Sequence, residues 1–245
     1  MPLSARKRLK FDPGDRPIYA IGDVHGRLDL LQQAEAAIVE DASRMPGPKL
    51  IIMLGDYIDR GPSSAQVLAH LMTPAPQDFD RLCLLGNHEL MMLEYMNGSL
   101  PFTEWLKMGS AATLASYGLD AEHLKLIFPI ASKLDNFIRQ SLPRQHVEFL
   151  QRMPILIDTP HTIFVHAGID PSVPLEKQTD EDLVFIRQRF FDSPIKLPKL
   201  VVHGHTPHNE PEIARRRLNV DTRAFKSGHL TVARLWRGRV HLFST

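Results

Sequence analysis

Short apolar runs recur along this sequence, and each ends in glycine together with aspartate, asparagine or histidine. The runs occupy residues 18–23, 49–56, 81–88, 162–168 and 199–205. Continuous apolar runs of this length, without alternating polar positions, are typical of strands that are buried on both faces of a sheet. The pattern therefore predicts buried strands with polar residues gathered at their carboxyl ends.

Helical patterns separate the first three runs. The apolar residues that share one helical stripe in these segments are Leu28, Leu31, Ala34, Ala37, Ile38, Val67, Leu68 and Leu71. Spacings of three and four residues place such side chains on one face of a helix. Because strand and helix alternate, the sequence predicts an α/β fold.

The end of the chain has a different pattern. Residues 230–236 and 239–245 are rich in β-branched and apolar residues, and only Arg-Gly separates them. This arrangement predicts an antiparallel hairpin, which we expect to join a second sheet.

Residues 90–153 carry little strand signal. Their short helical patterns are interrupted by glycine and proline, which indicates a mainly helical insertion between the third and fourth strands. The sequence contains no internal repeat or low-complexity linker, so we expect one domain over residues 1–245.

The charge balance excludes strong electrostatic steering. The chain has 29 Lys and Arg against 28 Asp and Glu, a formal charge of +1 and a pI of about 8.0. We therefore expect no nucleic-acid or membrane partner. The basic segment 1–16 precedes no apolar signal region and is interpreted as a solvated tail. The lone Cys83 excludes an intrachain disulfide, which favours a cytoplasmic protein.

The polar residues at the strand ends are of the types that bind metals. They are Asp23, His25, Asp56, Asp59, Asn87, His88, His166 and His205. Mixed carboxylate, imidazole and amide ligands suit divalent ions such as manganese, iron or zinc. Five strand ends supply too many ligands for one tetrahedral ion, so two ions that share a bridging carboxylate fit better.

Five motifs occur in a fixed order between residue 22 and about residue 230: GDVHG, GDYIDRG, GNHE, HAG and GHT. Together they resemble the bacterial phosphoprotein phosphatases, the serine/threonine phosphatase branch of the binuclear metallophosphoesterases. The resemblance implies a calcineurin-like β-sandwich of two mixed sheets flanked by helices. It also implies a pair of divalent ions at the carboxyl ends of the strands.

The resemblance further implies a division of roles. The metal ligands would be Asp23 and His25 for the first ion, Asp56 as the bridge, and Asn87, His166 and His205 for the second ion. His88 would then be the general acid toward the leaving oxygen, and Asp59 would hold it. A carboxylate partner is needed there because a nearby dication disfavours a protonated imidazole.

Two arginines are candidates for binding the substrate phosphate. Arg60 follows Asp59 directly, and its forked guanidinium matches phosphate oxygens. The segment LVFIRQRF resembles the segment of bacterial family members that carries a second such arginine. We interpret Arg187 as that residue, although Arg189 lies on the same segment.

Several neighbouring residues receive other interpretations. Glu89 stands at a helix start, which favours a capping or structural hydrogen bond. His203 is interpreted as a packed histidine rather than a ligand. Pro207 stands where the wider superfamily often has another histidine, which favours the protein phosphatase branch. The loop NVDTRAFKSGHL resembles the family's DTGAVYGG only loosely, with Arg223 for glycine and Lys226 where an aromatic residue is common.

The leading hypothesis is a metal-dependent phosphomonoesterase that acts on phosphoserine or phosphothreonine in proteins or peptides, with phosphotyrosine as a further substrate. It would use direct attack by a metal-bound hydroxide and two divalent ions, with manganese expected first and iron or zinc as alternatives. One alternative is a hydrolase of dinucleoside polyphosphates or small phosphorylated metabolites. Another is a binding scaffold without catalysis, which the complete set of motifs disfavours. The oligomeric state is left open.

Overall fold

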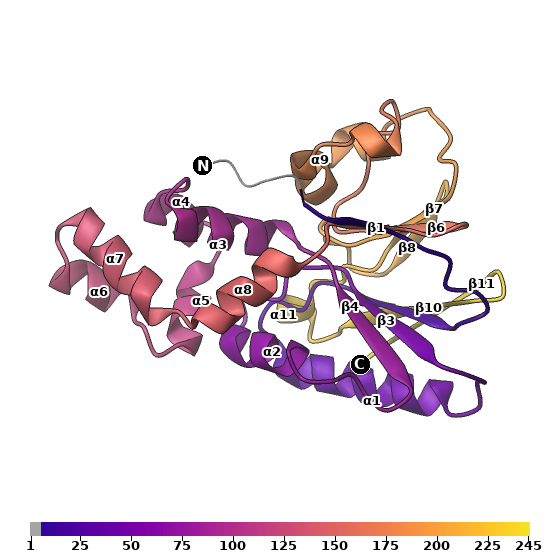
Figure 1. Cartoon of the computed structure of the whole chain (residues 1–245), viewed down its shortest axis with the longest axis horizontal. Coiled ribbons are helices and arrows are strands. Elements are labelled where there is room, and N and C mark those ends of the chain that lie inside the picture. Colours follow the sequence, from indigo (N-terminus) through magenta and orange to yellow (C-terminus); the bar gives the residue numbers. More distant parts are fainter. Residues whose placement is uncertain (1–5) are drawn as a thin grey trace.

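Two β-sheets face each other in the computed structural model, which describes residues 6–245 (Figure 1). The strands of the first sheet are β2 (Ile18–Ile21), β3 (Lys49–Met53), β4 (Phe79–Cys83), β10 (Thr231–Trp236) and β11 (Arg239–Ser244). The strands of the second sheet are β1 (Arg8–Lys10), β5 (Leu156–Asp158), β6 (Thr162–Val165), β7 (Leu200–His203), β8 (Glu212–Ala214) and β9 (Arg217–Asn219). The predicted α/β fold with two mixed sheets is confirmed.

The strand order brings the carboxyl ends of the parallel strands to one side. The first sheet has the order β11-β10-β2-β3-β4, and the second has the order β1-β5-β6-β7-β9-β8. Strands β2, β3 and β4 run parallel with Ile21 opposite Met53 and Met53 opposite Cys83. Strand β6 is parallel to β7, and β7 is parallel to β9. The loops that follow these strands therefore start at the same edge of each sheet.

Alternate residues on each strand serve different layers. Ile18 and Ala20 of β2 point into the interior between the sheets, where they belong to one buried apolar cluster with Phe164 and Val202 of the second sheet. The intervening residues of β2 belong to the other buried cluster, which includes the helices. Both faces are therefore apolar, which explains why the strands appear as continuous apolar runs.

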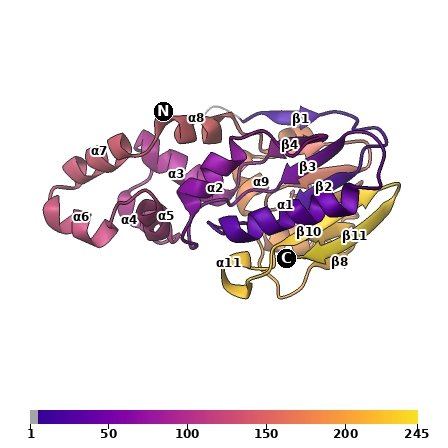
Figure 2. The same cartoon turned by 90° about the horizontal axis from the view of Figure 1, so that it is seen from below.

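Helices cover the outer face of each sheet. The first sheet is covered by α1 (Leu28–Ala42) and α2 (Ser64–Leu71), which lie beside it in Figure 2. The second sheet is covered by α9 (Asp180–Phe185) and α10 (Gln188–Phe191), which follow a short 3-10 turn, Leu175–Lys177. No helix within residues 6–245 combines the length and apolar character that crossing a membrane requires.

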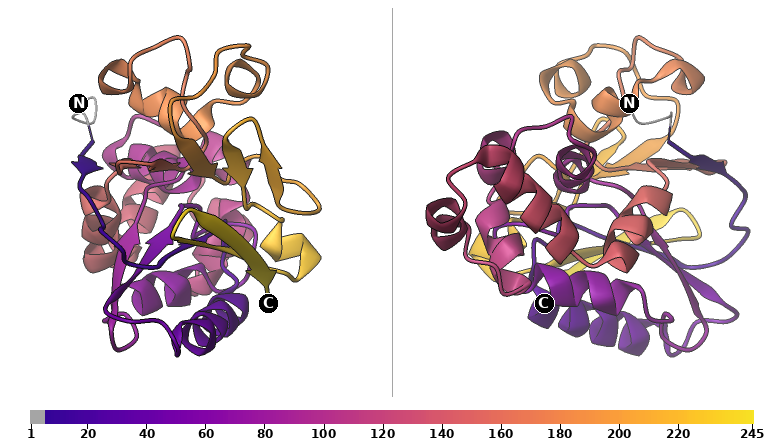
Figure 3. Two further views of the ribbon diagram at one scale, coloured as in Figure 1. Left: turned by 90° about the vertical axis from the view of Figure 1, so that its right-hand side faces the viewer. Right: turned by 60° about the vertical axis from the view of Figure 1, so that its left-hand side comes forward.

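A group of helices extends from one end of the sandwich in Figures 1 and 2, and the right-hand view of Figure 3 brings this end forward. These helices are α3 (Asn87–Asn97), α4 (Phe102–Leu106), α5 (Ser110–Ser116), α6 (Ala121–Ile127), α7 (Ala131–Ser141) and α8 (Arg144–Arg152). They run between β4 and β5, where the sequence predicts a helical insertion at residues 90–153. The assignment of residues 1–245 to a single domain stays a prediction.

Two expectations from the sequence are wrong. Residues 8–10 of the predicted tail form strand β1, which pairs in parallel with β5, while residues 1–5 lie outside the described part of the chain. Leu9 packs against the cluster between the sheets, and Arg8 donates to Asp180 Oδ1 over 3.1 Å. The β10–β11 hairpin forms as predicted, but it joins the sheet of β2 and β3 instead of a separate one.

Candidate active site

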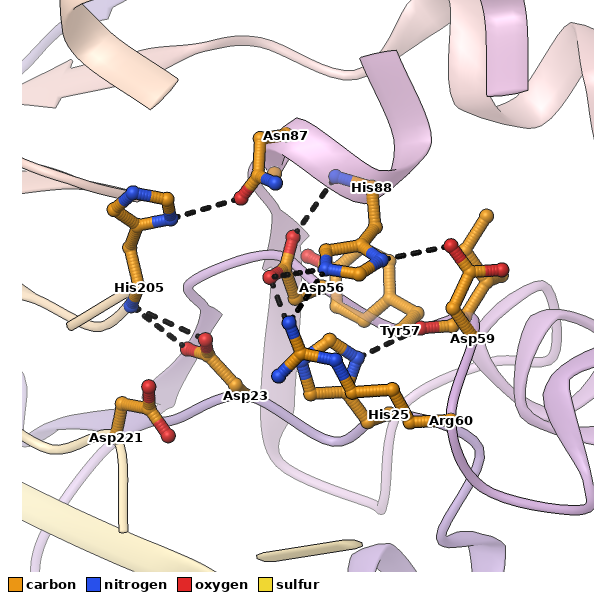
Figure 4. Close-up of polar contacts among 12 residues, drawn as sticks. Asp23, His25, Asp56, Tyr57, Asp59, Arg60, Asn87, His88, His205 and Asp221 are labelled. Carbon is orange, nitrogen blue, oxygen red and sulfur yellow. Dashed lines mark hydrogen bonds and ion pairs between the residues drawn. The ribbon is translucent and has the colours of Figure 1, made fainter. Parts of the chain in front are cut away.

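The polar residues at the strand ends converge on one site (Figure 4). The loop after β2 supplies Asp23 and His25, and the loop after β3 supplies Asp56, Asp59 and Arg60. The start of α3 supplies Asn87 and His88, and the ends of β6 and β7 supply His166 and His205. These nine predicted site residues therefore come together from five separate segments, and all of their side chains except that of Arg60 are buried.

Asp56 lies at the centre of the site. Its Oδ2 is 3.5 Å from His25 Nε2 and 3.7 Å from His88 Nε2, and its Oδ1 is 3.3 Å from His166 Nε2. The two carboxylate oxygens thus face different groups of nitrogen atoms. This geometry suits a carboxylate that bridges two cations.

Asn87 lies on the side of the site opposite to His25. Its Oδ1 is 2.9 Å from His166 Nε2 and 2.9 Å from His205 Nδ1. In the described part of the chain, two groups of side chains are close enough to share an ion: His25, Asp56 and His88, and Asp56, His166 and His205. Asp56 belongs to both groups.

The loops that carry these residues adopt backbone conformations that are uncommon for residues other than glycine. The φ angles are 43° at His25, 53° at Asp56, 69° at Asp59, 68° at Arg60 and 63° at His205. Such conformations cost free energy and persist only where the surrounding structure enforces them. Their concentration here indicates that the loops are shaped for a site and not only for connecting strands.

Glu89 holds the loop after β3 in this shape. Its carboxylate accepts hydrogen bonds from the backbone N–H groups of Gly86, Asp56, Tyr57 and Ile58 at distances of 2.7–3.2 Å. The fully buried Glu89 is the third residue of α3, and its bond to the Gly86 N–H caps the start of that helix. The predicted structural role of Glu89 is therefore confirmed.

Two glycines leave room for the carboxylates. A Cβ atom on Gly204 would overlap Oδ1 of Asp23, and a Cβ atom on Gly86 would overlap Oδ1 of Asp56. Any side chain at either position would displace a carboxylate from the site. The glycines of the GNHE and GHT motifs are thus required by close approach.

The electrostatics of the site favour cations. Burial lowers the pKa of His25 to about 3 and also lowers the pKa values of His166 and His205, so these imidazoles are neutral at pH 7. Burial raises the pKa of Asp23, and the carboxylates of Asp221 and Asp56 raise it further. Neutral imidazoles and crowded carboxylates are the donor set that divalent ions require, so these residues fit a metal pair.

Asp221 is a residue of the site that the sequence analysis does not predict. It lies beside Asp23 in Figure 4. Burial raises the pKa of Asp221 to about 6, while the backbone N–H of Arg223 donates to its Oδ1 over 2.9 Å. The sequence offered one signal, because Asp221 belongs to the loop NVDTRAFKSGHL. Only the fold shows that this loop reaches the site.

His88 and Asp59 form a buried pair at the edge of the site. His88 Nδ1 donates to Asp59 Oδ2 over 2.7 Å, and Thr113 Oγ1 donates to Asp59 Oδ1 over 2.5 Å. Burial lowers the pKa of His88, but the carboxylates of Asp56 and Asp59 outweigh this effect and hold that pKa above its usual value. The pair can therefore hold a proton on the imidazole.

Two arginines border the site on different sides. Arg60 Nη2 lies 3.2 Å from His88 Nε2, and Arg187 Nε donates to His205 Nε2 over 3.1 Å. Arg189 instead forms ion pairs with Asp170 and Asp182, neither of which is a predicted metal ligand. His203 is buried between Phe190 and Phe191 and belongs to neither group of ligand atoms.

A family model described as calcineurin-like phosphoesterase matches residues 16–231. The chain belongs to this family. It is therefore a hydrolase of the dinuclear, metal-dependent phosphoesterases, and it carries the side chains that such a centre needs.

Relatives within the calcineurin-like phosphoesterases carry different names. Serine/threonine-protein phosphatase 1 of Salmonella typhimurium is 27% identical over 90% of this chain and 92% of its own length. An asymmetrical bis(5'-nucleosyl)-tetraphosphatase of Halalkalibacterium halodurans is 25% identical over 87% and 88%, respectively. The chain spans only 30% of a zinc-dependent endopolyphosphatase of Saccharomyces cerevisiae and 32% of serine/threonine-protein phosphatase 2 of Escherichia coli.

Solved structures share the calcineurin-like phosphoesterase fold. A protein provisionally described as a diadenosine tetraphosphatase superposes with a TM-score of 0.67 over 98% of both chains, at 18% sequence identity. At this identity the likeness supports the fold and leaves the substrate undecided.

Proposed function

We propose that this phosphoesterase is a protein phosphatase that hydrolyses phosphoserine and phosphothreonine, and also phosphotyrosine. The observation that carries the proposal is the buried contact of 2.7 Å between His88 Nδ1 and Asp59 Oδ2. The leaving oxygen of a phosphoserine is strongly basic and needs a proton as its bond to phosphorus breaks. A histidine held protonated by a carboxylate supplies that proton.

The six ligand residues would hold two divalent ions, with manganese expected first and iron or zinc as alternatives. They are Asp23, His25, Asp56, Asn87, His166 and His205. Of these, His25, Asp56, His166 and His205 belong to the two groups of side chains that are close enough to share an ion. When bound, such a pair activates water and neutralises charge on the phosphate. Asp56 would contact both ions, since its two oxygens face separate groups of nitrogen atoms.

His88 would deliver its proton from Nε2. Asp59 occupies Nδ1, so Nε2 is the ring nitrogen that remains for the leaving oxygen. In the structure Arg60 lies at this nitrogen, 3.2 Å away. An incoming phosphate attracts the guanidinium, whereas a protonated imidazole repels it, so substrate binding would draw Arg60 away and free Nε2 for proton transfer.

Arg60 and Arg187 would hold the phosphate from two sides. Arg60 contacts His88 on one side of Asp56, and Arg187 contacts His205 on the other. One guanidinium group can bind two phosphate oxygens at once. Two such groups would therefore orient the phosphorus atom for attack by water. The ion pairs of Arg189 with Asp170 and Asp182 favour Arg187 for this role.

A second candidate function is the hydrolysis of dinucleoside polyphosphates. It is supported by the name of the Halalkalibacterium halodurans relative, which aligns with 87% of this chain. The leaving group in that reaction is itself a phosphate, which is less basic than an alkoxide and needs less help from an acid. The extent to which the rate depends on His88 and Asp59 therefore distinguishes the two functions.

The test measures the wild-type protein and one variant on two substrates. The manganese-loaded protein and Asp59→Asn are assayed on a phosphoserine peptide and on diadenosine tetraphosphate, with the exposed Asp15→Asn as a control for the loss of a carboxylate. We expect the wild-type protein to favour the peptide. Asp59→Asn should lower kcat/KM on the peptide by about 10²-fold, and on the tetraphosphate by less than about tenfold.

Faster turnover of the tetraphosphate, together with an equally small effect of Asp59→Asn on both substrates, would favour the second function. Bound metal without turnover of either substrate would favour a binding scaffold.

A further inference from the structure

The aromatic ring of Phe225 lies at the rim of the site. It belongs to α11 (Ala224–Ser227), the short helix within the loop NVDTRAFKSGHL. The ring meets the His25 imidazole edge-on, with centroids 5.4 Å apart and an interplanar angle of 85°. The guanidinium carbon of Arg60 lies over the same ring, 4.9 Å from its centroid. Phe225 thus contacts a metal-ligating histidine and a phosphate-binding arginine together.

These contacts form a closed set. Arg60 Nη2 reaches His88 Nε2 over 3.2 Å, and the rings of His88 and His25 lie 4.6 Å apart at 78°. His25 in turn contacts Phe225, which closes the ring of contacts among these four side chains. Arg60, the only exposed member of the set, is fixed by the aromatic ring on one side and by the histidine on the other.

The backbone of α11 is tied to the site. Arg27 Nη1 donates to the carbonyl oxygen of Ala224 over 3.1 Å, and Arg27 itself pairs with Asp29. On the other side, Asp221 accepts the backbone N–H of Arg223, which has a positive φ of 57°. The position of the Phe225 ring is therefore set by contacts on both sides of its short helix.

We propose that Phe225 is a positioning residue for Arg60, which holds the guanidinium at the rim of the site before the phosphate arrives. An exposed arginine loses much rotamer freedom when it binds a ligand. An aromatic face that attracts the cation reduces that loss, whereas an aliphatic side chain of similar size has no such attraction. The proposal rests on the proposed function only in assigning the phosphate to Arg60.

The first test replaces the ring. In the manganese-loaded protein, Phe225→Leu should raise KM for 4-nitrophenyl phosphate by about two- to fivefold, the range that cation–π contacts at exposed sites imply, with kcat within about a factor of two. The inhibition constant of inorganic phosphate should rise by the same factor. Phe225→Tyr should restore both values, because it restores an aromatic face.

The control variant is Lys226→Ala, which alters the exposed neighbour on the same helix. It should leave KM unchanged. Bound manganese, measured by elemental analysis, should be equal in all of these variants. If Phe225→Leu loses metal, or if Phe225→Tyr fails to restore KM, the ring acts through His25 or through the fold, and the proposal is wrong.

A double-mutant cycle tests whether Phe225 acts through Arg60. Arg60→Ala removes the partner, so adding Phe225→Leu to it should change the phosphate inhibition constant no further. Equal effects of Phe225→Leu with and without Arg60 would contradict the proposal. If the wild-type protein does not hydrolyse the ester, the proposed function fails, and calorimetric binding of inorganic phosphate to the same four proteins still decides the role of Phe225.

Discussion

His88 and Asp56 lie close together but are assigned different roles. His88→Asn should keep both metal ions and reduce kcat by about 10²–10⁴, the usual contribution of a general acid. Asp56→Asn should lose metal as well as activity, because Asp56 faces both groups of ligand nitrogens. Elemental analysis and steady-state kinetics on the same preparations provide the comparison. Equal loss of metal in both variants would contradict the separation of roles.

Cys83 is expected to be unreactive. Burial raises the pKa of its thiol to about 12, so little thiolate exists at pH 8. Because only the thiolate is nucleophilic, alkylation by iodoacetamide should be about 10³-fold slower than in the urea-unfolded chain, where a pKa of about 8.5 applies. Mass spectrometry over a time course measures both rates, and comparable rates would contradict the raised pKa of the thiol.

Hydrolysis without a covalent intermediate is a further expectation from these side chains. Phosphorus should be attacked by water, since the thiol of Cys83 has a pKa of about 12 and is a poor nucleophile. In water labelled with oxygen-18, a single turnover should place the label in the released phosphate. A phosphorylated protein trapped by acid quench would rule out direct attack.

The loop after β3 and the start of α3 depend on one carboxylate. Glu89→Gln places an amide N–H₂ among four backbone N–H donors and leaves some of them without an acceptor. We expect the free energy of unfolding to fall by about 1–3 kcal/mol. Glu104→Gln, at an exposed pair with Lys107, should change it by less than about 0.5 kcal/mol. Urea denaturation distinguishes the two, and equal stability of both variants would contradict the role of Glu89.

The strands and the site residues could be predicted because each polar motif follows a continuous apolar run. The sheet to which each strand belongs could not be predicted. Runs that are buried on both faces carry no alternation that identifies a partner strand, so the hairpin β10–β11 was assigned to the wrong sheet. Strand β1 was missed because three residues, with only Leu9 facing inward, are too few to show a period of two. Asp221 and Phe225 reach the site only through the fold of their loop.

The site is built from loops at the strand ends of both sheets. Metal binding should therefore stabilise the entire fold, since the ligands come from five segments of both sheets. Manganese at about 100 times its dissociation constant should add about 2.7 kcal/mol, or about 5–10 °C in Tm for a chain of this size. Differential scanning fluorimetry with and without a chelator measures the shift, and Asp56→Asn should show much less of it. An equal shift in both proteins would place the metal elsewhere.

The central claim is that the carboxyl ends of strands from both sheets form one dinuclear centre around Asp56. Anomalous diffraction from a manganese-soaked crystal tests it most directly. We expect two anomalous peaks on either side of Asp56, one near His25 and one near Asn87, His166 and His205. A single peak, or peaks away from these side chains, would contradict the account.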